Sequence, residues 1–117
     1  MYRAPQKDIR FVLDELLNVQ SLAGSPGLAD YSPELAESIL SEAARFAETV
    51  LEPLNIPGDR EGARWTPDGV ITPKGFKEAY QQFVAGGWPQ LGADPEYGGQ
   101  AVPHALGTAV REMWGSA

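Results

Sequence analysis

The segment SPELAESILSEAARFAETVLEP, residues 32–53, establishes the fold class of this 117-residue chain. Ser32 supplies a hydroxyl N-cap, and Pro33 stands at the first helical position, where its missing N–H is harmless. Apolar residues then recur every three or four positions, which predicts a long amphipathic helix near residues 33–52. They are Leu35, Ile39, Ala43, Phe46 and Val50. Pro53 is expected to end this helix, because proline removes a helical hydrogen bond.

The same periodicity predicts three more helices, near residues 5–19, 73–85 and 103–115. The first has the apolar set Ile9, Val12, Leu13, Leu16 and Leu17. The next is expected to start from a Thr72–Pro73 cap, and its face is unusually aromatic, with Phe76, Tyr80, Phe83 and Val84. The last carries Leu106, Ala109, Val110, Met113 and Trp114.

Glycine and proline divide these helices. Residues 21–30 are predicted to be a linker, and turns are expected at residues 57–59 and 67–69. Asp68–Gly69 lies between Trp65 and a β-branched pair, which allows a very short hairpin near residues 65–71. The sequence therefore predicts an all-α fold of about four helices. Residues 1–30 form an extension helix with its linker, and residues 31–117 form a helical domain.

Composition excludes several function classes. The formal net charge is -7 and the nine basic residues are dispersed, which argues against a nucleic-acid partner. The chain has no cysteine and a single histidine, His104, so disulfides, thiolate metal sites and a histidine metal cluster are excluded. Acidic residues interrupt the first apolar segment before it reaches membrane-span length. These features favour a soluble, cytoplasmic protein without a membrane span.

The loop GGWPQLGADPEYGGQAVP, residues 86–103, is the strongest candidate for a functional surface, because long loops rich in glycine, proline and aromatic residues are usually shaped surfaces. Gly98–Gly99 lacks the preceding strand and the spacing of a phosphate-binding loop. Asp94 and Glu96 are more typical of a solvated turn than of an acid/base pair. We therefore assign no catalytic, cofactor-binding or metal-binding residue.

Aromatic residues are concentrated in the second half of the chain. They include Trp65, Trp88, Tyr97 and Trp114. These side chains could cover the core beneath the loops, or they could form the wall of an apolar ligand pocket. The sequence alone leaves both interpretations open, with core covering favoured.

An ordered series of short segments resembles the amino-terminal region of an acyl-CoA dehydrogenase. The segments are YRAP (2–5), DIRFVL (8–13), PLN (53–55), GD (58–59), GVITPKGFKEAY (69–80), GW (87–88) and DPEYGGQ (94–100). The series covers essentially the whole chain in order. It is similar in particular to the longer subgroup with an extra amino-terminal helix, which includes many bacterial enzymes of fatty-acid metabolism and methylmercaptopropionyl-CoA type enzymes.

The resemblance implies a full-length flavoenzyme that oxidises acyl-CoA to trans-2-enoyl-CoA with FAD, and that passes electrons to electron-transfer flavoprotein. It implies that this region packs over the acyl pocket without catalysing the reaction or binding FAD alone. The pocket-wall candidates are Tyr97, Gly98, Gly99, Val110, Met113 and Trp114. The alternative from another class is a free-standing all-α protein-interaction module.

The resemblance also implies that the helical domain is incomplete at residue 117. We then expect the apolar face of the last helix to need later segments for its burial. Its members are Leu106, Val110, Met113 and Trp114. Each is worth about 1.5–3 kcal/mol when fully buried, so an uncovered face favours self-association and a homo-oligomer.

Overall fold

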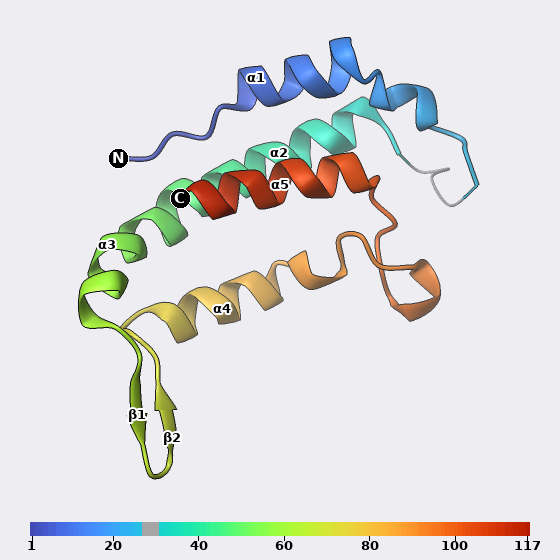
Figure 1. Ribbon diagram of the computed structural model, residues 1–117. Helices are drawn as coiled ribbons and strands as arrows, with labels where there is room; N and C mark the ends of the chain where they lie inside the picture. The colour runs from blue at the N-terminus through green and yellow to red at the C-terminus, as the bar shows by residue number, and fades with distance from the viewer. Residues whose placement is uncertain (27–30) are drawn as a thin grey trace.

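The computed structural model describes residues 1–26 and 31–117, and this part of the chain is predominantly helical, as predicted (Figure 1). The α-helices are α1 (Gln6–Arg10), α2 (Pro33–Phe46), α3 (Glu52–Glu61), α4 (Phe76–Ala85) and α5 (His104–Ser116). Two π-helical segments, η1 (Phe11–Leu16) and η3 (Ala47–Leu51), continue α1 and α2. Short 3-10 turns follow at η2 (Val19–Leu22), η4 (Trp88–Gln90) and η5 (Pro95–Tyr97). The strands are β1 (Arg64–Thr66) and β2 (Gly69–Ile71).

Helices α2 and α5 lie side by side, run in the same direction and form the centre of the molecule (Figure 1). Helix α1 packs on one side of this pair, while α4 lies on the other side (Figure 1). The core between them is built from small and large apolar side chains, including Leu40, Ala43, Leu106, Val110 and Met113. Alanines on α2 let α5 approach closely, so that the larger side chains of α5 are fully buried.

The long helix does not end at Pro53. The Glu52 N–H donates to the Ala47 carbonyl, five residues back, and α3 then continues to Glu61. A π turn is wider than an α turn, and we attribute the tolerance of Pro53 to this widening, since the ring must otherwise press on the preceding turn. The turn predicted at residues 57–59 is also wrong, because Pro57 and Gly58 lie inside α3.

The first predicted helix is present but does not follow one regular period. Ile9 and Leu13 are buried as expected, whereas Val12, Leu16 and Leu17 remain exposed. The π segment η1 takes up an extra residue per turn and rotates the later side chains away from the core. Of the predicted linker, residues 21–22 lie in η2, and residues 27–30 lie outside the described residues.

The short hairpin is confirmed. Arg64 pairs with Ile71, Trp65 with Val70 and Thr66 with Gly69 in antiparallel register. Figure 1 shows the hairpin projecting from the helical body. Its Trp65 side chain is exposed.

The Thr72–Pro73 helix start is wrong, because α4 begins at Phe76 with Gly75 at its N-cap. Gly75 has φ +89°, a left-handed conformation that favours glycine. A Cβ there would also lie 2.6 Å from Leu54 Cδ2, so α3 approaches the start of α4 closely at this glycine.

Burial is distributed differently from the sequence expectation. Leu106, Val110 and Met113 are buried against α2 within this chain, so they need no later segment. The uncovered face belongs instead to α4, where Phe76, Tyr80 and Val84 are exposed. The α2–α5 pair therefore buries these apolar side chains within this chain, whereas α4 leaves part of its apolar face exposed.

The molecule is thin and open. Its dimensions are 51 × 34 × 17 Å and its radius of gyration is 16.4 Å, against about 13 Å for a compact domain of this length. The accessible surface is 7925 Å², against about 6,200 Å² for a compact monomer of this mass. Within the described residues, no helix is long and apolar enough to cross a membrane.

Candidate functional site: an aromatic cluster and its apolar groove

Trp114, near the end of α5, is the centre of an aromatic cluster that joins α4 to the core. Its ring lies 5.5 Å from Phe46 on α2, 5.5 Å from Phe83 on α4 and 4.9 Å from Trp88 in η4. All three contacts are edge-to-face, the geometry that aromatic quadrupoles favour. Trp114 thus contacts both the core pair and the outlying helix.

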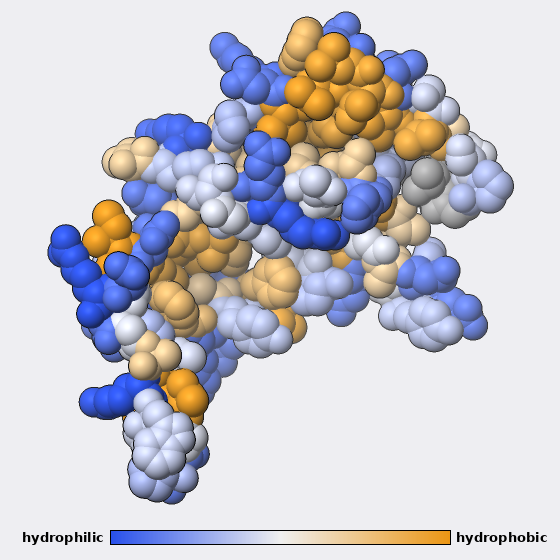
Figure 2. Space-filling view, viewed as in Figure 1, coloured by the Kyte–Doolittle hydropathy of each residue, from blue (hydrophilic) through white to orange (hydrophobic). Residues whose placement is uncertain are grey.

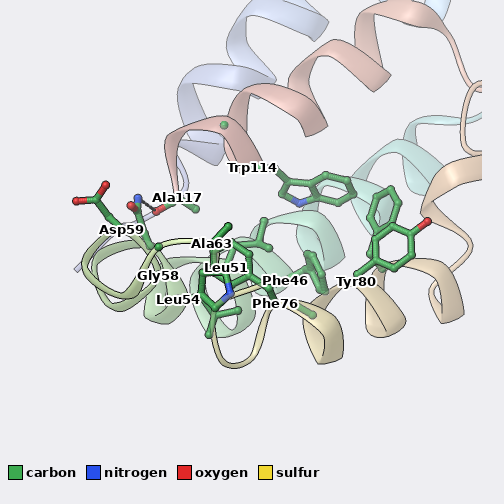
Figure 3. A pocket seen from close by; sticks show the side chains of 16 residues that line it. Phe46, Leu51, Leu54, Gly58, Asp59, Ala63, Phe76, Tyr80, Trp114 and Ala117 are labelled. Carbon is green, nitrogen blue, oxygen red and sulfur yellow. Dashed lines mark hydrogen bonds between the residues drawn. The ribbon is translucent and has the colours of Figure 1, made fainter. Parts of the chain in front are cut away.

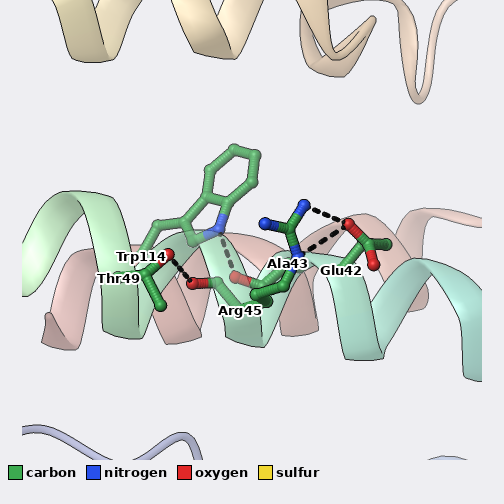
Figure 4. Close-up of polar contacts among 5 residues, drawn as sticks. All are labelled: Glu42, Ala43, Arg45, Thr49 and Trp114. Atoms are coloured by element: carbon green, nitrogen blue, oxygen red, sulfur yellow. Dashed lines mark hydrogen bonds and ion pairs between the residues drawn. The ribbon is translucent and has the colours of Figure 1, made fainter.

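A hydrogen bond fixes the Trp114 indole. Its Nε1–H donates to the Ala43 carbonyl at 3.0 Å (Figure 4). The same carbonyl accepts the Ala47 N–H, at the point where α2 changes into the π segment η3. Nearby, the Thr49 hydroxyl donates to the Arg45 carbonyl at 2.7 Å. Side-chain donors therefore add hydrogen bonds to carbonyls around this junction, and π segments within helices often mark functional sites.

Charges lie on the outer side of this junction. Arg45 donates to the Glu42 carboxylate at 2.6 Å on the exposed surface of α2 (Figure 4). This hydrogen bond, together with the charge of Arg45, lowers the pKa of Glu42. The aromatic cluster itself contains no charged side chain, so its contacts do not depend on the ionisation of its members.

An apolar groove of about 860 Å³ opens beside the cluster, between α3, α4 and the end of α5 (Figure 3). Its apolar lining comprises Phe46, Leu51, Leu54, Phe76, Tyr80, Phe83 and Trp114, among others. Asp59 lies at one end, where Asn55 also donates from Nδ2 to the Ala117 carbonyl at 2.7 Å. The groove can accept an apolar chain or an apolar side-chain surface.

Gly58 brings α3 and α4 together at this groove. A Cβ at Gly58 would lie 2.5 Å from Phe76 Cε1, which is closer than real Cβ atoms approach a ring. The Phe76 ring therefore packs directly on the α3 backbone. This contact shapes the α3 side of the groove.

The loop over residues 86–103 is closed by its own backbone. Gln100, Ala101 and Val102 donate N–H groups to the carbonyls of residues 90, 93 and 91, each at 3.0 Å. A Cβ on Gly99 would overlap the Ala93 carbonyl, so this position requires glycine. The loop is thus a shaped surface, as its composition predicts, and it lines a second hollow of about 460 Å³ with α5.

The six pocket-wall candidates do not form one surface. Trp114 lines both the groove and the second hollow, and Val110 lines the second hollow from the core. Met113 is fully buried between helices. Tyr97 and Gly98 are exposed on the loop, with Gly99 half-buried beside them. The structure therefore brings Val110, Met113 and Trp114 together on α5.

The residues that line most of the groove were not among the sequence candidates. The sequence predicts Phe76, Tyr80 and Phe83 as an unusually aromatic helix face, but they are not among its pocket-wall candidates. The signal in the sequence was the unusually large number of aromatic residues on this one helix face. Across residues 1–26 and 31–117, no group of histidine, aspartate and glutamate could hold a metal ion. The groove offers binding surface and no cluster of reactive groups.

Sequence relatives identify the class of protein. The chain is 35% identical over 116 residues to the 3-methylmercaptopropionyl-CoA dehydrogenase of Ruegeria pomeroyi, a match that covers 99% of this chain and 20% of that protein. It is 30% identical over 113 residues to the broad-specificity linear acyl-CoA dehydrogenase FadE5 of Mycobacterium tuberculosis, which covers 95% of this chain and 18% of that protein. No protein-family model matches the chain.

Both relatives are acyl-CoA dehydrogenases. The chain is homologous to them over nearly its whole length and corresponds to an amino-terminal region of the acyl-CoA dehydrogenase family, as the ordered series of motifs predicted. The chain spans about one fifth of the length of these relatives.

Proposed function

We propose that this chain is the amino-terminal helical domain of an FAD-dependent acyl-CoA dehydrogenase that oxidises acyl-CoA to trans-2-enoyl-CoA. The similarity to two acyl-CoA dehydrogenases over at least 95% of the chain carries this proposal. In the full-length enzyme, acyl-CoA is the substrate and electron-transfer flavoprotein is the electron acceptor. Residues 1–30 serve as the extension of the longer subgroup, and residues 31–117 belong to the helical domain.

The glycine pair of the loop does not fit a phosphate group of FAD. Gly98–Gly99 is the glycine pair considered above for binding a phosphate group. Gly99, however, packs against the Ala93 carbonyl and is needed to close the loop. That geometry leaves no cradle for a ligand against this glycine. We therefore propose that other parts of the full-length enzyme hold FAD, which accepts a hydride when bound, and that this domain contributes shape.

Within the enzyme, the domain supplies an apolar wall and packing. The groove beside Trp114 is lined by aromatic and aliphatic side chains, as a surface that covers an acyl chain requires. Trp114 is held by three aromatic contacts and one hydrogen bond, so the wall is preorganised before a ligand arrives. Exclusion of water by such a wall favours chemistry at the carbon next to the thioester.

The intact gene product distinguishes the enzyme from the alternative interaction module. We expect the purified native product to be yellow and to reduce an artificial electron acceptor when given acyl-CoA. A colourless product without this activity, which instead binds one protein specifically, would establish the interaction module. Intact mass, flavin absorbance and acceptor reduction measure these outcomes on one preparation.

Two exposed tyrosines, one in the groove and one on the loop, test which surface forms the wall of the acyl pocket. Tyr80 lines the groove, whereas Tyr97 lies on the loop. If the groove is the wall, Tyr80→Ala changes the ratio of kcat/KM between short and long acyl-CoA substrates and Tyr97→Ala does not. The reverse result assigns the wall to the loop. Unchanged ratios in both variants would remove the wall role while leaving the enzyme assignment intact.

A further inference from the structure

The segment before α1, residues 2–5, forms a strap across the seam where η3 contacts α5. Figure 1 shows the strap as the extended stretch between the N label and α1. Glu48 on η3 binds it twice. The Ala4 N–H donates to Glu48 Oε1 at 2.9 Å, and Arg3 Nη1 donates to Glu48 Oε2 at 3.3 Å. Pro5 lines a hollow of about 400 Å³ together with α5, so the strap reaches both sides of the seam.

Closure of the strap depends mainly on the Glu48 carboxylate. Both of its oxygens accept from the strap, and hydrogen bonds to an ionised carboxylate are stronger than those between neutral groups. The Glu48 side chain is only 23% exposed, which limits the screening of its charge by water. Ala4 packs against the core, but its single methyl group adds little apolar burial.

The Tyr2 hydroxyl opposes closure. It is buried from water, and no hydrogen-bond partner is found for it among the described residues. Burial, together with the nearby carboxylates of Glu112 and Glu48, raises the pKa of Tyr2. An unsatisfied buried hydroxyl costs free energy comparable to what one or two hydrogen bonds contribute. The closed strap thus combines a favourable contact at Glu48 with an unfavourable one at Tyr2, so its open state is accessible.

The strap is attached to the segment that supports the groove. Glu48 directly follows Ala47, whose N–H shares the Ala43 carbonyl with the Trp114 indole. The same π segment η3 contributes Leu51 to the groove lining. Closure of the strap therefore holds η3 from the side of residues 2–5, while Trp114 binds at the start of η3.

We propose that residues 2–5 are a releasable strap, which the Glu48 carboxylate holds closed over the η3–α5 seam and which the buried Tyr2 hydroxyl biases toward opening. Opening breaks both contacts with Glu48 and lets the hydroxyl bind water. Helix α1 stays in place, because Ile9 and Leu13 remain buried in the core. The strap is independent of the enzyme assignment, since it rests on contacts within this chain.

Trypsin cleavage of the Arg3–Ala4 bond in the intact gene product tests the strap, with loss of the first three residues read by mass. When closing is fast, the cleavage rate measures the population of the open strap. Glu48→Gln should raise this rate about tenfold, because the amide still accepts from Ala4 but no longer pairs with the charge of Arg3. Glu42→Gln is the matched control, since Glu42 pairs with Arg45 on α2 and should not affect the strap.

Tyr2→Phe distinguishes a strap biased toward opening from a purely structural segment. This change keeps the ring and removes the unsatisfied hydroxyl, so it should slow cleavage about fivefold. The rates should also be insensitive to low urea concentrations, because local release exposes little surface.

Four results would overturn the proposal. The first is cleavage of Tyr2→Phe at the wild-type rate or faster, and the second is an equal effect of Glu48→Gln and Glu42→Gln. A third is a steep rise of the Arg3 cleavage rate in low urea, which would assign cleavage to global unfolding. The last is the absence of cleavage in every variant.

Discussion

Apolar side chains are buried to different extents in the α2–α5 pair and on the α4 side of the molecule. Helix α5 places Leu106, Val110 and Met113 against α2, where they are almost fully buried. Helix α4 and the following turn η4 contact the same body through ring edges of Phe83 and Trp88 at Trp114, and α4 leaves Tyr80 and Val84 exposed. The difference shows that one side is a packed core, while the other leaves part of its apolar surface exposed.

A buried valine on α5 and an exposed valine on α4 should give the largest difference in stability between the two regions. Val110 on α5 is 1% exposed and Val84 on α4 is 45% exposed. Val110→Ala should lower the free energy of unfolding by roughly 1.5–3 kcal/mol, because two buried carbon atoms and their packing are lost. Val84→Ala should change it by less than about 0.5 kcal/mol. Urea unfolding of both variants measures the difference, and equal losses would mean that α4 belongs to the core.

The contact between Gly58 and Phe76 tests how α4 is held to α3. Gly58→Ala should destabilise the protein by roughly 1 kcal/mol, since the new Cβ would overlap the Phe76 ring, which must then turn away from α3. In a Phe76→Ala background the same change should stabilise by up to about 1 kcal/mol, because alanine is the better helix former and the ring is gone.

This reversal of sign is the diagnostic result, measured by thermal or urea unfolding of the four proteins in the double-mutant cycle. If Gly58→Ala has the same effect in both backgrounds, the Phe76 ring does not pack on the α3 backbone as described. The α3–α4 contact would then contribute nothing to the shape of the groove.

Local rules predicted those parts of the fold that depend on neighbouring residues. The start of α2 at Pro33 follows from the Ser32 cap, and the hairpin follows from Asp68–Gly69, since both signals act within a few residues. The continuation of the helix through Pro53 did not follow, because it depends on a π turn upstream.

The candidate site was less predictable, because its walls come from residues that lie far apart in the sequence. Trp114 was selected from its position on an apolar helix face, and it does line the groove. The other walls come from α3 and α4, which meet because Gly58 accepts the Phe76 ring. In the sequence Gly58 lies in a predicted turn and Phe76 lies on a predicted aromatic helix face, so their contact is visible only in three dimensions.

The indole hydrogen bond of Trp114 gives the smallest and most specific test, because it joins the two regions under comparison. Trp114→Phe removes the donor to the Ala43 carbonyl but keeps an aromatic ring beside Phe46 and Phe83. That carbonyl still accepts the Ala47 N–H, so it is not left unsatisfied.

The loss from Trp114→Phe should therefore be only about 0.5–1.5 kcal/mol in urea unfolding. Trp88→Phe is the control, because it makes a similar ring truncation and no hydrogen bond of its indole is found among the described residues. An equal loss in both variants would assign the effect to ring size. A larger loss in Trp114→Phe would show that the hydrogen bond, which anchors the aromatic cluster to the core, holds α4 in place.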